Sequence, residues 1–381
     1  MKILIMPDSF KGSLSSAEAG ESIERGIKKV YSSAQTIMLP FADGGEGTVD
    51  ALAYGCNGEI YTINVTGPLG IKVLCKYAII YGNTAIIEMA GAAGLALIRK
   101  EERNPVYTTT YGVGEVIRDA VDKGCRKFII GIGGSATNDG GIGMLQALGF
   151  GMENRYGKPV AYGAAGLKEL AVIRKENVMP ELKECSFKIA CDVTNPLCGE
   201  NGCSAVFGPQ KGASPGMVVQ MDSWMENYLA LAKRAMPLAD GNIPGTGAGG
   251  GIGFAFVTFL DACLEPGVQL VLQETGFIKH IKTADIIITG EGCLDGQTVM
   301  GKAPAGIAKI AKQYNKLVIA FSGSVTDKAA DCNKAGIDAF FPVLRSVCTL
   351  DEAMDKERAE KNIEDTVEQV FRLIKATGKI C

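Results

Sequence analysis

The sequence predicts an α/β protein: a doubly wound parallel-sheet domain built from both chain ends, and a second α/β domain inserted between them. Near the N-terminus, two apolar strands each run into a Gly/Asp loop and then into a helix, which is typical of parallel βα units. Residues 283–376 alternate strand and helix in the same way. Residues 59–89 instead hold three β-branched runs joined by turns, which indicates an antiparallel meander within the inserted domain.

The individual elements follow from apolar periodicity and from cap and turn residues. The first part of the chain is expected to hold strand 2–7, a helix over 16–29 capped by Ser16, strand 36–41 and helix 49–55. The central part is expected to hold meander strands 59–65, 72–81 and 84–89, helix 111–124, strand 127–132, helix 142–150, strand 187–193 and helix 252–264. The last part is expected to alternate strands 283–289, 316–321 and 338–343 with helices 304–314 and 351–376.

The simplest assembly joins residues 1–58 and 283–381 in one domain and places residues 59–282 in the inserted domain. Two domains are expected because single cores stop growing at about 250–300 residues, and this chain has 381. An active-site cleft between the two domains is the corresponding expectation. Strand 127–132 could pair into either sheet, because periodicity does not decide pairing.

Composition excludes several classes of function. A net charge of -3 gives no reason to bind nucleic acid or anionic lipid, and no apolar run of about 18 residues predicts a membrane span. The single histidine, His280, excludes histidine triads and His-rich metal sites. Twelve cysteines without a CxxC pair, and no secretory signal, predict a cytoplasmic protein with reduced thiols. Its expected partners are small molecules and, for a homo-oligomer, further copies of the chain.

Four loops at strand ends carry the candidate chemistry, where open α/β folds bind ligands. They cover residues 8–13, 42–48, 133–141 and 290–295 and are rich in Gly, Ser, Thr and Asp. Any one of these loops could instead be an ordinary turn in which Asp or Ser caps the next helix. Together they supply hydroxyls and backbone N–H groups for phosphate oxygens, Lys for charge, and carboxylates for magnesium, as phosphoryl transfer requires.

Two nucleotide-binding motifs are approached but not matched. Residues 296–302 fit the start of a P-loop, but Ala303 replaces the Ser/Thr that would hold magnesium, and the preceding strand is expected to end well before Gly296. Residues 131–136 fit a dinucleotide fingerprint, but residues 137–141 postpone the helix that should follow at once. If this fingerprint held a pyrophosphate, the alternative function would be an NAD-dependent oxidoreductase acting on a small hydroxy acid. A non-catalytic binding protein for small acids is a third reading, but such proteins usually carry an export signal.

At these loops the chain resembles the type 1 glycerate kinase family, from residue 1 to about residue 375. The similar blocks are PDSFKGSLS (7–15), ADGGEGT (42–48), GIGGSATNDGGIGMLQALG (131–149), CDVTNPLCGENGCSAVFGPQKGA (191–213) and ITGEGCLDGQTVMGK (288–302). The resemblance implies a flavodoxin-like domain plus an inserted α/β domain, and transfer of the ATP γ-phosphate to a hydroxyl of glycerate with Mg²⁺. It favours 2-phosphoglycerate over 3-phosphoglycerate as the product. The chain departs from the family pattern at Cys293, where Arg is common, and at Met300, where His is common.

The binding residues are assigned as a hypothesis. Glycerate is expected to contact Ser9 and Lys11, beside the N-terminus of the helix that follows them. The ATP phosphates are expected to contact the glycine-rich loop at Gly133, Gly134, Ser135, Thr137 and Asn138.

The catalytic and metal-binding residues are expected to be carboxylates. The attacking hydroxyl needs a proton acceptor within hydrogen-bond reach, and a carboxylate is basic enough for phosphoryl transfer. Asp192, at the end of strand 187–193, is the first candidate for this acceptor and Asp43 is the second; either could instead cap its own loop. Asp139 and Asp295 are the candidates for magnesium.

Overall fold

The computed structural model describes residues 1–274 and 276–378, and these residues form two compact units. The terminal unit comprises residues 1–43, 50–57 and those from Val268 onward, and the inserted unit comprises residues 44–49 and 58–267. We expected the chain to return to the terminal domain at residue 283. Residues 268–282 instead group with the terminal unit.

The terminal unit contains a five-stranded parallel sheet in its described residues. Its strands are β1 (Lys2–Pro7), β2 (Gln35–Met38), β11 (Ile286–Leu294), β12 (Leu317–Val325) and β13 (Ala339–Pro342). They lie in the order β2-β1-β11-β12-β13. When the strands of this unit are counted from one to five, this is the 2-1-3-4-5 order of flavodoxin-like folds.

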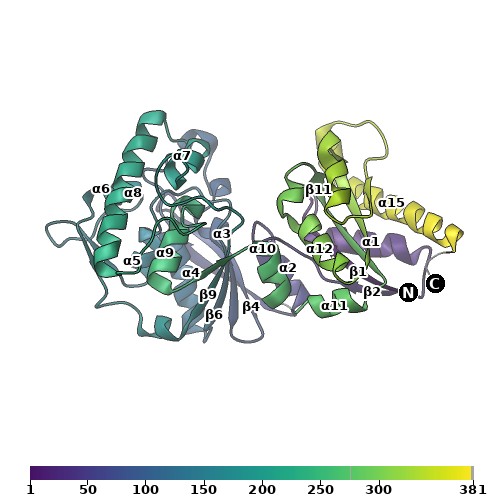
Figure 1. Cartoon of the computed structure of the whole chain (residues 1–381), viewed down its shortest axis with the longest axis horizontal. Helices are drawn as coiled ribbons and strands as arrows, with labels where there is room; N and C mark the ends of the chain where they lie inside the picture. Colours follow the sequence, from purple (N-terminus) through teal and green to yellow (C-terminus); the bar gives the residue numbers. More distant parts are fainter. Residues whose placement is uncertain (275, 379–381) are drawn as a thin grey trace. The chain divides into compact units, whose positions relative to one another are not determined.

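Helices cover both faces of this sheet (Figure 1). The helices of this unit are α1 (Ser16–Lys28), α2 (Thr48–Gly55), α10 (Gly267–Glu274), α11 (Ile278–Thr283), α12 (Ala303–Lys312), α13 (Asp331–Lys334), α14 (Leu350–Met354) and α15 (Lys356–Thr377). On one face, Ile3 and Ile5 of β1 share a buried cluster with Ile23 of α1 and Val367 of α15. α12 contacts β11 and β12, and α11 contacts β1. The sheet is therefore enclosed between helical layers, as the apolar strands predicted.

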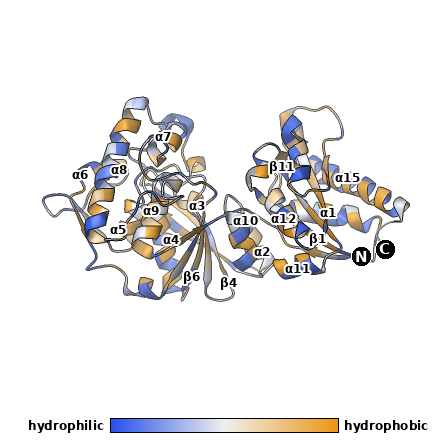
Figure 2. Cartoon of the chain, viewed as in Figure 1, coloured by the Kyte–Doolittle hydropathy of each residue, from blue (hydrophilic) through white to orange (hydrophobic). Residues whose placement is uncertain are grey.

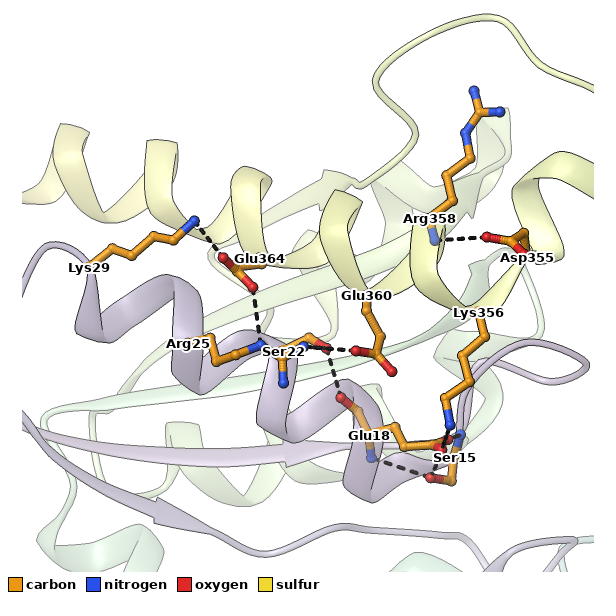
Figure 3. Close-up of polar contacts among 10 residues, drawn as sticks. All are labelled: Ser15, Glu18, Ser22, Arg25, Lys29, Asp355, Lys356, Arg358, Glu360 and Glu364. Atoms are coloured by element: carbon orange, nitrogen blue, oxygen red, sulfur yellow. Dashed lines mark hydrogen bonds and ion pairs between the residues drawn. The ribbon is translucent and has the colours of Figure 1, made fainter.

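Helices α1 and α15 run side by side and are joined by ion pairs (Figure 3). Arg25 lies 3.0 Å from both Glu360 and Glu364, and Lys29 lies 2.5 Å from Glu364. These pairs are partly exposed, so each is expected to contribute only about 0–1 kcal/mol. The close approach of the helices depends on Gly26, where an added Cβ would lie 2.6 Å from the Glu364 carbonyl oxygen.

The inserted unit is built on a six-stranded sheet in the order β10-β9-β6-β5-β4-β3. The strands of this unit, including a separate β7–β8 pair, are β3 (Glu59–Thr66), β4 (Lys72–Ile80), β5 (Thr84–Glu88), β6 (Lys127–Gly131), β7 (Gly151–Glu153), β8 (Val172–Arg174), β9 (Ser186–Ala190) and β10 (Cys263–Glu265). β3, β4 and β5 form the expected antiparallel meander. β5 also pairs in parallel with β6, so the meander extends the parallel part of the same sheet.

Helices of the inserted unit enclose a second core. They are α3 (Met89–Ala93), α4 (Tyr111–Asp122), α5 (Ile142–Ala147), α6 (Ala164–Glu169), α7 (Cys203–Phe207), α8 (Pro215–Ala235) and α9 (Ile252–Leu260). Aromatic rings from neighbouring strands stack in this core, with the centroids of Phe128 and Phe187 4.8 Å apart. Figure 2 shows hydrophobic residues concentrated along the strands and mixed with hydrophilic ones along helices such as α8 and α15.

The predicted fold class is confirmed: a flavodoxin-like domain from both chain ends and an inserted α/β domain with a meander. Some elements differ from expectation. The expected helix 252–264 ends at Leu260 and is followed by strand β10, and the expected helix 351–376 is interrupted at Asp355. Helix α8 was not expected. No helix in the described part of the chain is long and apolar enough to cross a membrane.

Candidate active site

Three neighbouring strands of the terminal unit deliver a carboxylic acid to the same sheet edge. Asp8 follows β1, Glu291 lies near the end of β11, and Asp43 follows β2. The Asp8 N–H donates to the Gly290 carbonyl at 2.8 Å, so β1 and β11 stay paired up to Asp8 and Glu291. In the 2-1-3-4-5 order, the junction of β1 and β11 is the topological switch point, where such sheets bind ligands.

Asp8 is the most deeply buried of these three residues, with 6% of its surface exposed. Its Oδ1 accepts a hydrogen bond from the Ser9 N–H at 2.6 Å. Burial, together with the negative charge of Asp43, raises the pKa of Asp8 to about 7, against the opposing effects of the Ser9 N–H and the Lys11 charge. A carboxyl group with this pKa can both accept and release a proton at neutral pH.

Glu291 on β11 and Asp295 in the loop after it are both held by local hydrogen bonds. The Thr298 hydroxyl donates to Glu291 Oε1 at 2.6 Å, and burial raises the pKa of Glu291. Asp295 Oδ1 accepts the N–H groups of Gln297 and Thr298 at 2.7 and 3.1 Å. The same oxygen lies 3.8 Å from Lys302 Nζ. Asp295 and Lys302 thus lie in the short loop after β11, and Thr298 of the same loop ties it to Glu291 on the strand.

This loop is closer to a P-loop than the sequence indicated. The strand before it was expected to end at residue 289, but β11 runs to Leu294 and α12 begins at Ala303. Residues 295–302 therefore connect a strand directly to a helix, and one of the two objections to a P-loop was wrong. The other objection stands, because Ala303 has no hydroxyl for magnesium. Lys302 stays available for contact with a phosphate.

A cavity of about 330 Å³ lies within the terminal unit at this sheet edge. Its polar lining includes Asp8, Ser9, Lys11, Glu291, Asp295 and Lys302. Its apolar lining includes Phe10, Val343, Leu344, Leu350, Met354 and Ile363. A cavity of this size with a few convergent polar groups is typical of a small-molecule site. Ser9 and Lys11, expected to bind substrate, thus share one cavity with the acidic residues.

The N-terminus of α1 is closed by its own side chains (Figure 3). The cap is Ser15, and Ser16, which we expected to be the cap, is the first helical residue. Ser15 Oγ accepts the Glu18 N–H, the Glu18 carboxylate accepts the Ser15 N–H at 2.8 Å, and Lys356 pairs with Glu18. These contacts engage the Ser15 and Glu18 N–H groups and place the Glu18 carboxylate at the helix start, where an anion would otherwise be favoured. The helix start that we expected to help bind glycerate is therefore occupied.

The glycine-rich loop of the inserted unit follows β6 and is accessible only at its beginning. Gly133 and Gly134 are exposed and Ser135 is 6% exposed. Thr137 and Asn138 are completely buried. Of the five residues expected to contact phosphates, only the two glycines are therefore exposed to solvent.

Hydrogen bonds of buried polar side chains fix this loop on its buried side. Lys211 donates to the Thr137 carbonyl at 2.6 Å, and burial lowers the pKa of Lys211 to about 8. Asn138 donates from Nδ2 to Ser204 Oγ at 2.8 Å. Within the described residues, Thr137 Oγ1 and Asn138 Oδ1 are buried without a hydrogen-bond partner. Thr137 and Asn138 are thus part of the scaffold that fixes the loop.

The Asp139 carboxylate is completely buried and occupied by hydrogen bonds. Its Oδ2 accepts from the N–H and the hydroxyl of Thr110 at 2.8 and 2.9 Å, and its Oδ1 accepts from the Gly141 N–H at 3.0 Å. A magnesium ligand needs an oxygen that the ion can reach. The geometry therefore favours a structural role for Asp139, which ties the loop to the start of α4.

Asp192 follows β9 and is exposed, as expected for a residue at a strand end. Its Oδ1 accepts the Gly267 N–H at 3.0 Å. The nearby sheet edge is tightly packed by glycines: an added Cβ at Gly44 would lie 2.2 Å from the Ala190 Cβ, and one at Gly131 would lie 1.8 Å from the Gly44 oxygen. The chain that follows Asp43 is therefore seated directly over the ends of β6 and β9.

The dinucleotide fingerprint is not supported by the local structure. β6 ends at Gly131 and α5 begins at Ile142, so residues 132–141 separate the strand from the helix. A dinucleotide site needs the helix N-terminus immediately after the glycines, so that its N–H groups reach the pyrophosphate. No observation on this loop favours the oxidoreductase alternative.

Comparison with known proteins identifies the family. The sequence model of the family described as "Glycerate kinase family" matches residues 3–375 of this chain. The chain belongs to the glycerate kinase family. Glycerate 2-kinase of Escherichia coli (strain K12) is 45% identical over 373 residues, covering 96% of this chain and 98% of that protein. Glycerate kinase of Bacillus subtilis (strain 168) is 44% identical over 376 residues, covering 98% of each.

A solved structure agrees with this assignment. The crystal structure of a protein assigned as glycerate kinase 2 of Salmonella typhimurium LT2 has a TM-score of 0.91 and 43% sequence identity, and the match covers 100% of this chain and 99% of that one. As a member of the glycerate kinase family, the chain is an enzyme of the phosphotransferase class.

One departure from the family pattern falls in the cavity. Cys293 is half-buried and lines the cavity of the terminal unit, where a thiol stands in place of the Arg that we expected from the family. The cavity therefore depends on Lys11 and Lys302 for positive charge. The side chain of Met300, the second departure, lies outside the described part of the structure.

Three residues that the structure singles out were given no role of their own from the sequence, although Asp8 and Glu291 lie in two of the four candidate loops. Asp8 and Glu291 each follow a strand that was expected, and the 2-1-3 strand order implied by the resemblance places those strand ends side by side. This signal could have revealed them. Lys211 has no comparable signal, because lysine is almost always exposed and its burial depends on tertiary packing.

Proposed function

We propose that the chain is an ATP-dependent kinase that transfers the γ-phosphate of ATP to a hydroxyl group of glycerate, which yields phosphoglycerate and ADP. The family and the names of the relatives support glycerate as the substrate. The observation that carries the chemistry is the cavity that brings Asp8 and Glu291 together with Lys11 and Lys302. Phosphoryl transfer needs cations beside the phosphate oxygens and carboxylates beside the metal and the hydroxyl.

We place glycerate against the polar lining of the cavity. The charge of Lys11 suits the carboxylate of glycerate, and the Ser9 side chain can hydrogen-bond either a carboxylate or a hydroxyl. The capped start of α1 contributes no further anion contacts, so Lys11 should supply much of the attraction.

For the phosphates of ATP we propose backbone contacts at Gly133 and Gly134, the exposed start of the glycine-rich loop. Ser135 is the only other residue of the five expected to contact phosphates with an exposed fraction above zero, and Thr137 and Asn138 would act by fixing the loop. An added side chain at Gly134, whose φ is 70°, would strain the backbone there.

A carboxylate is needed to accept the hydroxyl proton, and Asp43 and Asp192 remain predictions for this role. Mg²⁺ is usually held by one or two carboxylates together with phosphates and water. Asp295 fits this arrangement, because its backbone contacts use Oδ1. The described residues contain no group of three or more His, Cys, Asp or Glu side chains arranged as a metal site. Bound Mg²⁺ would supply charge to the phosphates of ATP.

The product is proposed to be 2-phosphoglycerate, because a relative that is 45% identical is named glycerate 2-kinase. A cytoplasmic location and a homo-oligomeric state stay predictions from the sequence.

A coupled ADP-release assay with a panel of hydroxy acids tests this proposal. We expect ADP release with ATP, Mg²⁺ and glycerate that exceeds the release with lactate, malate or tartrate. Equal release with and without glycerate would contradict the proposal. A parallel assay with NAD⁺ and the same acids should show no change in absorbance at the nicotinamide band.

A further inference from the structure

Asp8 belongs to the polar lining of the cavity. It lies between Asp43 on the β2 side and Glu291 on the β11 side, at the switch point of the sheet. Its backbone is fixed by the hydrogen bond to the Gly290 carbonyl, and its side chain lines the cavity next to Ser9. A substrate that contacts Ser9 and Lys11 would therefore place its polar groups beside Asp8.

The Asp8 carboxylate is more than nine-tenths buried, yet one of its oxygens has no hydrogen-bond partner. Oδ1 accepts the Ser9 N–H at 2.6 Å, and no hydrogen bond to Oδ2 occurs among the described residues. Oδ2 is not among the completely buried polar atoms that lack a partner, so solvent or a ligand can reach it and supply a donor. The substrate hydroxyl is a donor of the required kind, and the cavity gives it access to Oδ2.

The other candidates are less suited to accept a proton. Asp192 is exposed, and its Oδ1 already accepts the Gly267 N–H. Asp43 is half-buried, and its negative charge acts on Asp8. Glu291 is 8% exposed, lines the same cavity and likewise has one oxygen held, by the Thr298 hydroxyl. Asp8 differs from Glu291 in its position directly before Ser9 and three residues before Lys11, the residues expected to contact the substrate.

We propose that Asp8 is a catalytic residue, the carboxylate that takes the proton from the attacking hydroxyl of the substrate. This inference rests on the kinase function proposed above. The hydroxyl oxygen forms a bond to the γ-phosphorus, and the bond from that phosphorus to the β,γ-bridging oxygen breaks, with its electron pair leaving on ADP. The hydroxyl proton passes to Oδ2 of Asp8 and from there to solvent.

The charges around Asp8 set the pH at which it can act. Asp43 and Glu291 face it as negative groups and favour its protonated form, whereas Lys11 favours its ionised form. Asp43 has the larger influence of the two acids. Activity should therefore rise as Asp8 loses its proton, and removal of the Asp43 charge should let Asp8 ionise at lower pH.

The test compares kcat, KM and pH profiles of Asp8→Asn and Asp43→Asn with those of the wild-type enzyme. Asp8→Asn should lower kcat by about 10²–10⁴-fold, the usual contribution of a general base, with a smaller change in the KM for glycerate. In Asp43→Asn, whatever its rate, the acid limb of kcat/KM should move to lower pH. Asp285→Asn, an exposed carboxylate at the opposite end of β11, is the matched control and should keep wild-type rates.

Several outcomes would overturn the assignment. These are a kcat of Asp8→Asn within a few fold of the wild type, a loss that appears only in the KM for glycerate, or recovery of Asp8→Asn by excess Mg²⁺, which would indicate a metal ligand. If Asp8→Asn fails to fold, the pH profile of Asp43→Asn decides, and an acid limb that stays in place contradicts the proposal. An inactive wild-type enzyme would instead contradict the kinase function itself.

Discussion

Lys11 is the residue on which we expect substrate binding to depend most. It is exposed, lines the cavity, and follows a turn whose neighbouring helix start is already capped. We expect Lys11→Ala to raise the KM for glycerate by roughly 10–100-fold, because a charge-assisted hydrogen bond contributes about 1.5–3 kcal/mol. Steady-state kinetics with glycerate varied at saturating ATP measures this. Lys334→Ala, at a distant exposed lysine on α13, is the control, and an unchanged KM in Lys11→Ala would remove Lys11 from the site.

Lys211 is a buried lysine whose pKa is lowered to about 8 in the folded protein, compared with an ordinary value of 10.5. Between these pH values the unfolded chain holds a proton that the folded chain has lost, so the free energy of unfolding should rise with pH across this window. The rise attributable to Lys211 is at most about 3 kcal/mol. We expect it to be absent from Lys211→Met.

Urea unfolding of the wild type and Lys211→Met between pH 7.5 and 10 measures this difference. Other groups that titrate in the same range affect both proteins equally, so the difference between the two curves isolates the lysine. Parallel curves would show that Lys211 does not change its protonation on folding.

Residues at strand ends were the most predictable part of the site, because an apolar strand followed by Asp, Ser or Gly is visible in the sequence. Ser9 and Lys11 were expected and do line the cavity. The burial and the hydrogen-bond partners of these loop side chains could not be predicted from the sequence. Asp8 and Asp139 read alike as loop acids, but Asp8 has an open oxygen and Asp139 has three donors that occupy its carboxylate.

At the scale of elements, the α1–α15 contact depends on the absence of a side chain at Gly26. Glycine inside a helix normally costs about 1 kcal/mol relative to alanine, so Gly→Ala usually stabilises an exposed helix. At Gly26, however, an added Cβ would lie 2.6 Å from the Glu364 carbonyl oxygen and 2.8 Å from the Val367 Cβ. We expect Gly26→Ala to destabilise the protein by about 1–3 kcal/mol, as overpacking does.

Gly216 provides the matched control, since it lies in the first turn of α8 and an added Cβ would meet nothing within 4 Å. Gly216→Ala should be neutral or slightly stabilising. Chemical denaturation of both variants measures the changes. Equal stabilisation by the two substitutions would show that the contact between α1 and α15 has room for a methyl group at residue 26.

Element types were well predicted where apolar periodicity was long, and poorly where a local signal interrupted it. The capping residue Asp355, which accepts the Arg358 N–H at 2.9 Å, starts a new helix inside what looked like one. The apolar run after α9 read as helix, but Asp261, with φ of 51°, ends that helix and lets β10 join the sheet. β11 extends beyond its apolar core because it pairs with β12 as far as Leu294.

At the scale of the whole molecule, the order of elements along the chain was enough to predict a parallel domain from both ends with an α/β insertion. The order of elements was not enough to predict strand pairing, because apolar periodicity does not say which strands lie next to each other in a sheet. Strand β6 was left open between two sheets, and in the structure it lies between β5 and β9. The boundary at residue 268 also escaped prediction, since α10 and α11 look like any other amphipathic helices.

The most direct test of the kinase function is ³¹P nuclear magnetic resonance of the wild-type protein incubated with ATP, Mg²⁺ and glycerate. The γ-phosphate signal of ATP should disappear as a phosphomonoester signal appears, and the new signal should coincide with authentic 2-phosphoglycerate. A signal that coincides with 3-phosphoglycerate would correct the position of transfer. Release of inorganic phosphate alone, or ATP that stays intact, would contradict the assignment of this chain as a glycerate kinase.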